Sequence, residues 1–356
     1  PEPAPEPTPE PTLPTDGICF GGTTGGMTSW QYYSAHGIKV KVDESACKFK
    51  KKPVVVTSLT GVSSHWTTTG GSSVYSDTAS SYTIYVHSSK GIKTANAQKW
   101  KWASDFLAQL PGKSKSGTCA GETPLGSTKW VYYSKNGIYV DVDTSACGFS
   151  KTPVYKTSIG GASHHWTTTG ASSVYKAKKN SFRIYIHQKD ITEKKAKKNK
   201  YHIKWIAHPV GTITVPGLGK TCAGKTVSGK TAWKTYENGK GKGIYVDVKT
   251  GCNFRGATPR YVTEVAGSSH HWTVTGTSEV YSPTATGFRM YLFDKSGIKP
   301  SEANKRAWSV QWIAAASEPD RDGICFGGTT GGMTSWQYYS AHGIKVKVDE
   351  SACKFK

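Results

Sequence analysis

A heptapeptide built on His-Trp recurs three times and divides the chain into similar modules. Its copies SHWTTTG, HHWTTTG and HHWTVTG end at Gly70, Gly170 and Gly276. Around each copy the same landmarks return in the same order: a Gly-Ile strand pattern, a Cys-x-Phe, a Pro, a Ser-x-Val-Tyr and a closing Trp. Repeats of this kind set the number of folding units. The sequence therefore predicts three related modules of about 100 residues.

The last part of the chain repeats its opening. Residues 322–356 are identical to residues 16–50, and 306 residues separate Cys19 from Cys325. We expect a stalk at 1–15, modules at 16–110, 111–215 and 216–321, and a partial fourth module at 322–356. Because the three modules have diverged while the tail has not, the repeat indicates a tandem array of three-module units. The alternative is an overlap that is no part of a natural array.

Short strand patterns fill each module. Segments such as IYVDVD, SFRIYIH and YHIKWIA alternate apolar and polar residues, and turn-forming residues bound them. About six to seven such strands in a module of this size are typical of an antiparallel β-sandwich. The predicted fold class is all-β, with three tandem antiparallel β-sandwich modules. We expect the closing residues Trp102, Trp205 and Trp312 to be equivalent core residues.

The cysteines fall into one pair per module. The pairs are Cys19/Cys47, Cys119/Cys147, Cys222/Cys252 and, in the tail, Cys325/Cys353. Their near-constant spacing predicts disulfides within modules and an oxidising, extracellular compartment. No CxxC motif or fixed histidine pair accompanies them, which disfavours zinc. We expect neither a metal nor a cofactor.

The first 15 residues, PEPAPEPTPEPTLPT, predict an extended polyproline II stalk. Thr8, Thr12, Thr15 and the stalk prolines are candidates for O-glycosylation. The alternative is an unmodified disordered linker.

The chain is strongly basic, with a formal net charge of +22. Such a surplus favours polyanionic partners. Lysines are densest in the second module, at Lys176, Lys178, Lys179, Lys194, Lys195, Lys197, Lys198 and Lys200. They predict either a solvated face or contact with acidic polysaccharide. Nucleic acid is disfavoured because the cysteines and the stalk indicate a secreted protein, and no apolar run is long enough for a membrane span.

The order of motifs resembles the H-type lectin family. The stretches FKKKPVVVTSL, FSKTPVYKTSI and FRGATPRYVTEV, the strand GFRMYL and the closing IKWIA and VQWIA carry the likeness, which covers most of each module. The resemblance implies small β-sandwich modules that assemble as trimers and bind sugars such as N-acetylgalactosamine in clefts between neighbours. It also implies that three modules in one chain could mimic one trimer. The His-Trp heptapeptide and the cysteine pair have no counterpart in the family pattern.

The His-Trp pairs are the most specific candidate site. They are His65/Trp66, His165/Trp166 and His271/Trp272. An aromatic face with a nearby polar partner suits a sugar ring, so these are candidate glycan-binding residues. In a strand the two side chains would point to opposite faces, so the pair shares a pocket only if the segment loops. The alternatives are a core Trp with a structural His, or a metal ligand, which the replacement of His164 and His270 by Ser64 in module 1 disfavours.

Catalytic motifs do not recur among the modules, so no enzyme is expected. The sequence favours a secreted repeat protein that self-associates as the building block of an extracellular fibre or cell-surface appendage, in contact with glycans. The alternative is a multivalent carbohydrate-binding lectin or adhesin.

Overall fold

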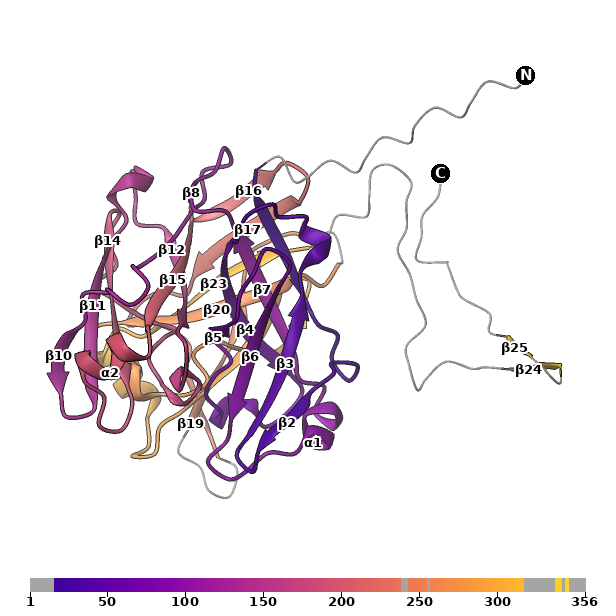
Figure 1. Ribbon diagram of the computed structural model, residues 1–356. Coiled ribbons are helices and arrows are strands. Elements are labelled where there is room, and N and C mark those ends of the chain that lie inside the picture. Colours follow the sequence, from indigo (N-terminus) through magenta and orange to yellow (C-terminus); the bar gives the residue numbers. More distant parts are fainter. Residues whose placement is uncertain (1–15, 238–242, 255–256, 317–336, 341–342, 346–356) are drawn as a thin grey trace. The chain divides into compact units, whose positions relative to one another are not determined.

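The computed structural model describes residues 16–237, 243–254 and 257–316, together with the backbone of 337–340 and 343–345 (Figure 1). The chain forms two units, Pro1–Ala316 and Ser317–Lys356. The predicted stalk with Thr8, Thr12 and Thr15, and the Cys325/Cys353 pair, lie outside the described residues.

Each module supplies a similar series of elements. Module 1 contains β1 (Ile18–Gly22), β2 (Gln31–Ser34), β3 (Gly37–Asp43), η1 (Ser45–Cys47), β4 (Val54–Gly61), η2 (His65–Thr67), β5 (Ser73–Tyr75), β6 (Ser81–His87), α1 (Thr94–Lys99) and β7 (Ala103–Gln109). Module 2 contains β8 (Gly112–Lys113), β9 (Cys119–Glu122), β10 (Val131–Ser134), β11 (Gly137–Asp143), η3 (Ser145–Cys147), β12 (Val154–Gly160), η4 (His165–Thr167), β13 (Ser173–Tyr175), β14 (Ser181–His187), α2 (Glu193–Lys198) and β15 (His202–His208). Module 3 contains β16 (Gly211–Val215), β17 (Gly219–Lys225), β18 (Lys234–Tyr236), β19 (Gly243–Lys249), β20 (Arg260–Gly267), η5 (His271–Thr273), β21 (Glu279–Thr284), β22 (Gly287–Phe293), α3 (Pro300–Lys305) and β23 (Ser309–Ala315).

The strands of one module belong to two sheets that enclose its core. In module 1, β1, β7 and β4 lie in one sheet, whereas β2, β3, β6 and β5 lie in another. The alternating pattern explains the packing, because Ile38, Val40 and Val42 are buried while the lysines between them are not. Separate apolar clusters form the cores of the three modules.

Each sheet continues from one module into the next, so the three modules close into a ring. The sheet orders are β2-β3-β6-β5-β12-β15-β9-β8, β10-β11-β14-β13-β20-β23-β17-β16 and β1-β7-β4-β21-β22-β19-β18. We call the three crossing points joint 1–2 (β5 with β12), joint 2–3 (β13 with β20) and joint 3–1 (β21 with β4), and all three are parallel pairings. The prediction of purely antiparallel sheets is therefore wrong, because the sequence pattern of a single module does not show how its edge strand pairs with a neighbour.

The modules also share a central core. An apolar cluster takes residues from all three modules, and β4, β12 and β20 contact one another within it. Its buried residues are Ile18, Val54, Val56, Leu107, Ala120, Val154, Ile206, Val215, Ala223, Val262 and Ile313. The ring is thus a single packed unit.

Three disulfides confirm the predicted pairing within modules. They join Cys19 to Cys47, Cys119 to Cys147 and Cys222 to Cys252. They indicate an oxidising environment, in agreement with an extracellular protein. Among the described residues, no helix is long and apolar enough to cross a membrane.

The closing tryptophans are all buried, but they are not equivalent. A residue in the left-handed region, Lys101, Lys200 or Ala307, follows each short helix and fixes the register of the closing strand. From these positions Trp102 aligns with Tyr201 and Trp308, whereas Phe106 aligns with Trp205 and Trp312. The predicted equivalence is wrong because Trp occurs at two different positions of the same strand.

The tail repeats one element of the ring. Strands β24 (Gln337–Ser340) and β25 (Gly343–Lys345) pair with the same register and the same irregularity as β2 and β3. Identical sequence therefore gives the same hairpin in both places.

Candidate functional site: the joints between modules

The His-Trp segments lie in tight turns and not in strands. His65, His165 and His271 each open a short 3-10 turn, after a residue in the left-handed region. That preceding residue is Ser64, His164 or His270. The three His side chains of the turns are fully buried. The turn lets His and Trp of one module face the same neighbouring module.

The Val-Tyr of the Ser-x-Val-Tyr motif receives the His-Trp of the next module. At joint 1–2, His165 Nε2 donates to the carbonyl oxygen of Val74 at 3.0 Å. Its ring stacks on Tyr75 with 3.6 Å between centroids, and the Tyr75 hydroxyl accepts from the Trp166 amide at 2.9 Å. We call this arrangement the clamp.

The clamp recurs at the other two joints. At joint 2–3, His271 donates to Val174 and stacks on Tyr175, whose hydroxyl accepts from the Trp272 amide. At joint 3–1, His65 and Trp66 engage Val280 and Tyr281 in the same way. The two motifs that repeat in the sequence are therefore the two halves of one contact, and they link the modules in a closed cycle.

Each Trp of the clamp lies against a glycine of the neighbouring module. A Cβ added at Gly37, Gly137 or Gly243 would lie 2.3–2.5 Å from the ring of Trp166, Trp272 or Trp66, respectively. Real Cβ atoms do not approach an aromatic ring so closely. The Gly that opens the Gly-Ile pattern of every module is thus explained by the need to admit this ring.

Burial keeps the clamp histidines neutral. It lowers the pKa of His165 to about 3 and the pKa values of His65 and His271 to about 4. A neutral imidazole has one N–H, and in each clamp that N–H faces a backbone carbonyl. The rings are therefore committed to holding neighbouring modules together.

The outer side of the clamp is a partly exposed cluster of aromatic rings. At joint 1–2, Tyr33, Tyr85 and His87 of module 1 contact Trp166 of module 2, with Tyr33 about half exposed at 49%. Tyr133, Tyr185 and His187 surround Trp272 at joint 2–3. Tyr236, Tyr291 and Phe293 surround Trp66 at joint 3–1. Such clusters offer ring faces and edges at the surface of each joint.

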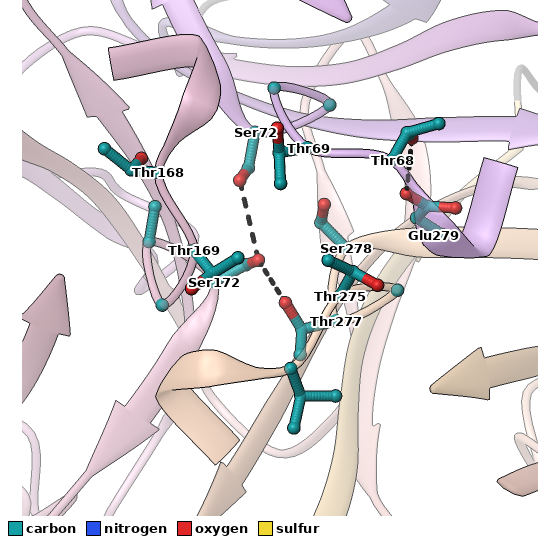
Figure 2. A pocket seen from close by; sticks show the side chains of 16 residues that line it. Thr68, Thr69, Ser72, Thr168, Thr169, Ser172, Thr275, Thr277, Ser278 and Glu279 are labelled. Atoms are coloured by element: carbon teal, nitrogen blue, oxygen red, sulfur yellow. Dashed lines mark hydrogen bonds between the residues drawn. The ribbon is translucent and has the colours of Figure 1, made fainter. Parts of the chain in front are cut away.

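The loops TTTG, TTTG and TVTG, which end the three heptapeptides, meet around a small polar cavity, which Figure 2 shows with Thr and Ser side chains from all three modules. The space open to water inside it is about 20 Å³, enough for one or two water molecules. Ser172 links the modules here, because its hydroxyl bonds Ser72 at 3.5 Å and Thr277 at 2.7 Å. The cavity is too small for a sugar.

Deeper in the ring, equivalent positions carry different residues. Ser158 accepts from the Thr57 amide, and Ser58 accepts from the Thr263 amide, at 3.0 and 2.9 Å. Module 3 has Glu264 at this position, and its carboxylate accepts from the Thr157 amide. Burial raises the pKa of Glu264, and Lys156 of module 2 opposes that rise through its charge.

A second glutamate distinguishes joint 3–1. The hydroxyls of Ser73 and Ser173 donate to the carbonyls of His165 and His271 at the other joints. At the equivalent position Glu279 accepts from the Thr68 hydroxyl at 3.3 Å and lies 3.9 Å from His65 Nε2. Burial raises the pKa of Glu279 well above its usual range, so the carboxyl is held neutral.

Ion pairs also differ from joint to joint. At joint 3–1, Arg260 bonds the buried Asp105 at 2.6 Å. At joint 1–2, the buried Lys204 bonds Asp77 and Glu122, each at 2.7 Å. At joint 2–3, the equivalent position holds Gln311, which accepts from the Tyr155 amide. Each joint therefore has its own polar partners beneath a common clamp.

The predicted lysine cluster of module 2 is exposed, and its first member, Lys176, directly follows the clamp residue Tyr175. The lysines of residues 194–200 are on or next to α2, and all five of them, Lys194, Lys195, Lys197, Lys198 and Lys200, are exposed. Within the described part of the chain, no group of three or more metal-ligating side chains occurs.

Sequence reasoning found the His-Trp pairs but missed their partners. It did not connect His-Trp with Val-Tyr, the opening Gly or the buried Glu264 and Glu279. The signal for the first two was present, since all three modules keep these motifs. The assignment of the six His and Trp residues to glycan binding remains a prediction. No protein-family model, no curated protein and no solved structure matches the chain.

Proposed function

We propose that the ring is the repeating building block of an extracellular fibre or cell-surface appendage. One observation carries this proposal: the three modules close on one another through a cycle of parallel joints. A closed ring is a self-contained bead, so a tandem array of three-module units would be a string of such beads. Self-association and a Pro-rich segment between beads would give a filament, a role that needs no catalytic group.

Size and shape of the native material test the proposal. Negative-stain microscopy of material from its natural source is expected to show strings of equal particles. Mass spectrometry of the same material is expected to give a polypeptide much larger than 38.5 kDa, or a polymer. Single discrete particles of one ring each would contradict the fibre role.

The aromatic clusters support a second candidate function, that of a multivalent glycan-binding protein. The resemblance to H-type lectins implies sugars between neighbouring modules, and each joint carries a cluster of aromatic rings at its surface. A sugar ring could stack on such faces. The buried His side chains would then support the Trp from behind, without touching the sugar.

A matched pair of variants tests this candidate. Tyr33 contacts Trp166 at joint 1–2, whereas among the described residues the adjacent Tyr32, which is also exposed, makes no ring contact with the Trp. If the clusters bind glycan, Tyr33→Ala together with Tyr133→Ala lowers glycan-array binding at least about tenfold, a loss of about 1.4 kcal/mol. Tyr32→Ala with Tyr132→Ala leaves it unchanged. Equal losses in both pairs, or no binding by the parent, would count against the clusters.

A further inference from the structure

The surface that holds residues 16–50 has a second possible occupant in the same chain. This surface, which we call the first-segment site, is formed by β6, β7 and residues 114–116. Strand β3 pairs along β6, and β1 pairs along β7. The carboxylate of Asp16 accepts from the amides of Lys115 and Ser116 at 2.7 and 2.8 Å. All these partners lie outside residues 16–50.

The segment that fills the site carries its own cross-link. Cys19 and Cys47 both belong to residues 16–50, so the segment is closed by its disulfide independently of the rest of the ring. Trp30 Nε1 donates to the Trp102 carbonyl at 3.0 Å, and Ile38 is fully buried in the core of module 1. Binding at the site therefore depends on side chains and backbone pairing that any identical segment can reproduce.

Residues 322–356 are such a segment, since they match residues 16–50 at every position. Their hairpin β24–β25 already has the register of β2–β3. In the sequence of the tail, the counterparts of Asp16, Trp30 and Ile38 are Asp322, Trp336 and Ile344. The counterparts of Cys19 and Cys47 are Cys325 and Cys353. The tail has the chemical groups that the first-segment site requires.

The connection to the tail also has a suitable length. In the ring, Cys19 pairs with Ala108, Cys119 with Ala207 and Cys222 with Ala314. The chain leaves module 1 at Ala108 and enters module 2 at Cys119, eleven residues later. It reaches Cys325 eleven residues after Ala314. Because the ring repeats the same geometry at each joint, the connection that spans joint 1–2 can also span joint 3–1.

We propose that residues 322–356 can replace residues 16–50 in the first-segment site, closing the same ring with the chain order shifted by one segment. This goes beyond the fibre role, because it concerns how one ring is completed. In a tandem array, the copy of residues 16–50 that begins each unit could then fill the first-segment site either of its own ring or of the ring before it.

Substitution of one buried residue in each copy of the full chain tests the proposal. Ile38→Asp places a carboxylate in the core of module 1, and Ile344→Asp does so in the tail copy. The matched control is Ile138→Asp, at the equivalent and equally buried position of module 2, for which the chain holds no second copy. Melting temperature and molar mass by light scattering are measured for each variant and for the double variant Ile38→Asp/Ile344→Asp.

The two single variants in the first segment and tail are expected to keep the molar mass of the parent and to melt within about 5 °C of it. The double variant and Ile138→Asp are expected to lose cooperative melting. Limited proteolysis locates the bound copy: residues 16–50 are protected in the parent, and the tail is protected in Ile38→Asp. The proposal is overturned if Ile38→Asp melts like the double variant, or if Ile38→Asp melts like the parent only in particles of larger molar mass than the parent.

Discussion

Joint 1–2 and joint 3–1 use the same clamp but different interiors. Both stack a buried His on a Tyr, and both seat a Trp against a Gly of the neighbour. Beneath the clamp, joint 1–2 has Ser73, whereas joint 3–1 has Glu279. The difference shows two levels of specification. The clamp is the contact that all three joints share, and the interior residues give each joint polar contacts of its own.

We expect the largest loss of stability from a substitution in the interior of joint 2–3. Glu264→Ser removes the acidic group whose charge offsets the burial of Lys156, and we expect a loss of about 3 kcal/mol in the free energy of unfolding. The backbone contact itself survives, because Ser58 and Ser158 accept the same bond at the other joints. Denaturant unfolding measures the loss.

The control for that variant gives the interior of joint 2–3 the residue types found at the equivalent positions of the other joints. Adding Lys156→Val gives joint 2–3 the residues that modules 1 and 3 carry, since Val56 and Val262 are equivalent to Lys156. The double variant is expected to unfold within about 1 kcal/mol of the parent. An equally unstable double variant would show that the charges do not act as a pair.

The clamp itself is tested at its glycine. Gly137→Ala places a methyl group against the Trp272 ring and is expected to cost about 1–3 kcal/mol. The same substitution in a chain with Trp272→Ala should cost much less, because the ring is gone. The interaction energy from this double-mutant cycle measures the Gly–Trp contact. Additive losses would mean that the cost of Gly137→Ala comes from strand β11 itself and not from contact with Trp272.

Acid is expected to weaken the clamp. The folded-state pKa of His165, about 3, lies below its ordinary value of 6.5. Its contribution is therefore complete above pH 6.5 and declines as the pH falls toward 3. The stability advantage of the parent over His165→Gln should shrink by about 2 kcal/mol between pH 7 and pH 5. Unfolding curves at several pH values measure this change. An advantage that stays constant with pH would show that folding does not shift the pKa of His165.

The smallest effect is expected at the rim of joint 1–2. Lys52 is 43% exposed and contacts Asp77 and Glu122, which also bond the buried Lys204. Lys52→Ala should cost less than about 1 kcal/mol, because exposed pairs contribute little. Replacement of the buried Lys204 by Ala is the informative contrast, since it removes the buried cation that bonds both carboxylates.

The sequence predicted what is local and repeated. Strands, three disulfides and the burial of Trp102, Trp205 and Trp312 follow from alternation, spacing and composition. The closed ring was not predictable in this way, because it depends on pairing between β21 and β4, more than 200 residues apart. The buried Glu264 and Glu279 were also missed, since a glutamate in an alternating strand reads as solvent-facing until the neighbouring module is known.

The cyclic clamp also has a consequence for the gene. Every module presents a His-Trp to the module before it and a Val-Tyr to the module after it. With three modules in a cycle, every His-Trp has a Val-Tyr partner. Loss or gain of a single module by recombination would change the number of modules in the ring. It would also separate the residues that contact each other at each joint. Recombination that adds or removes three modules together keeps every match. The 306 residues between Cys19 and Cys325 correspond to one such step of three modules.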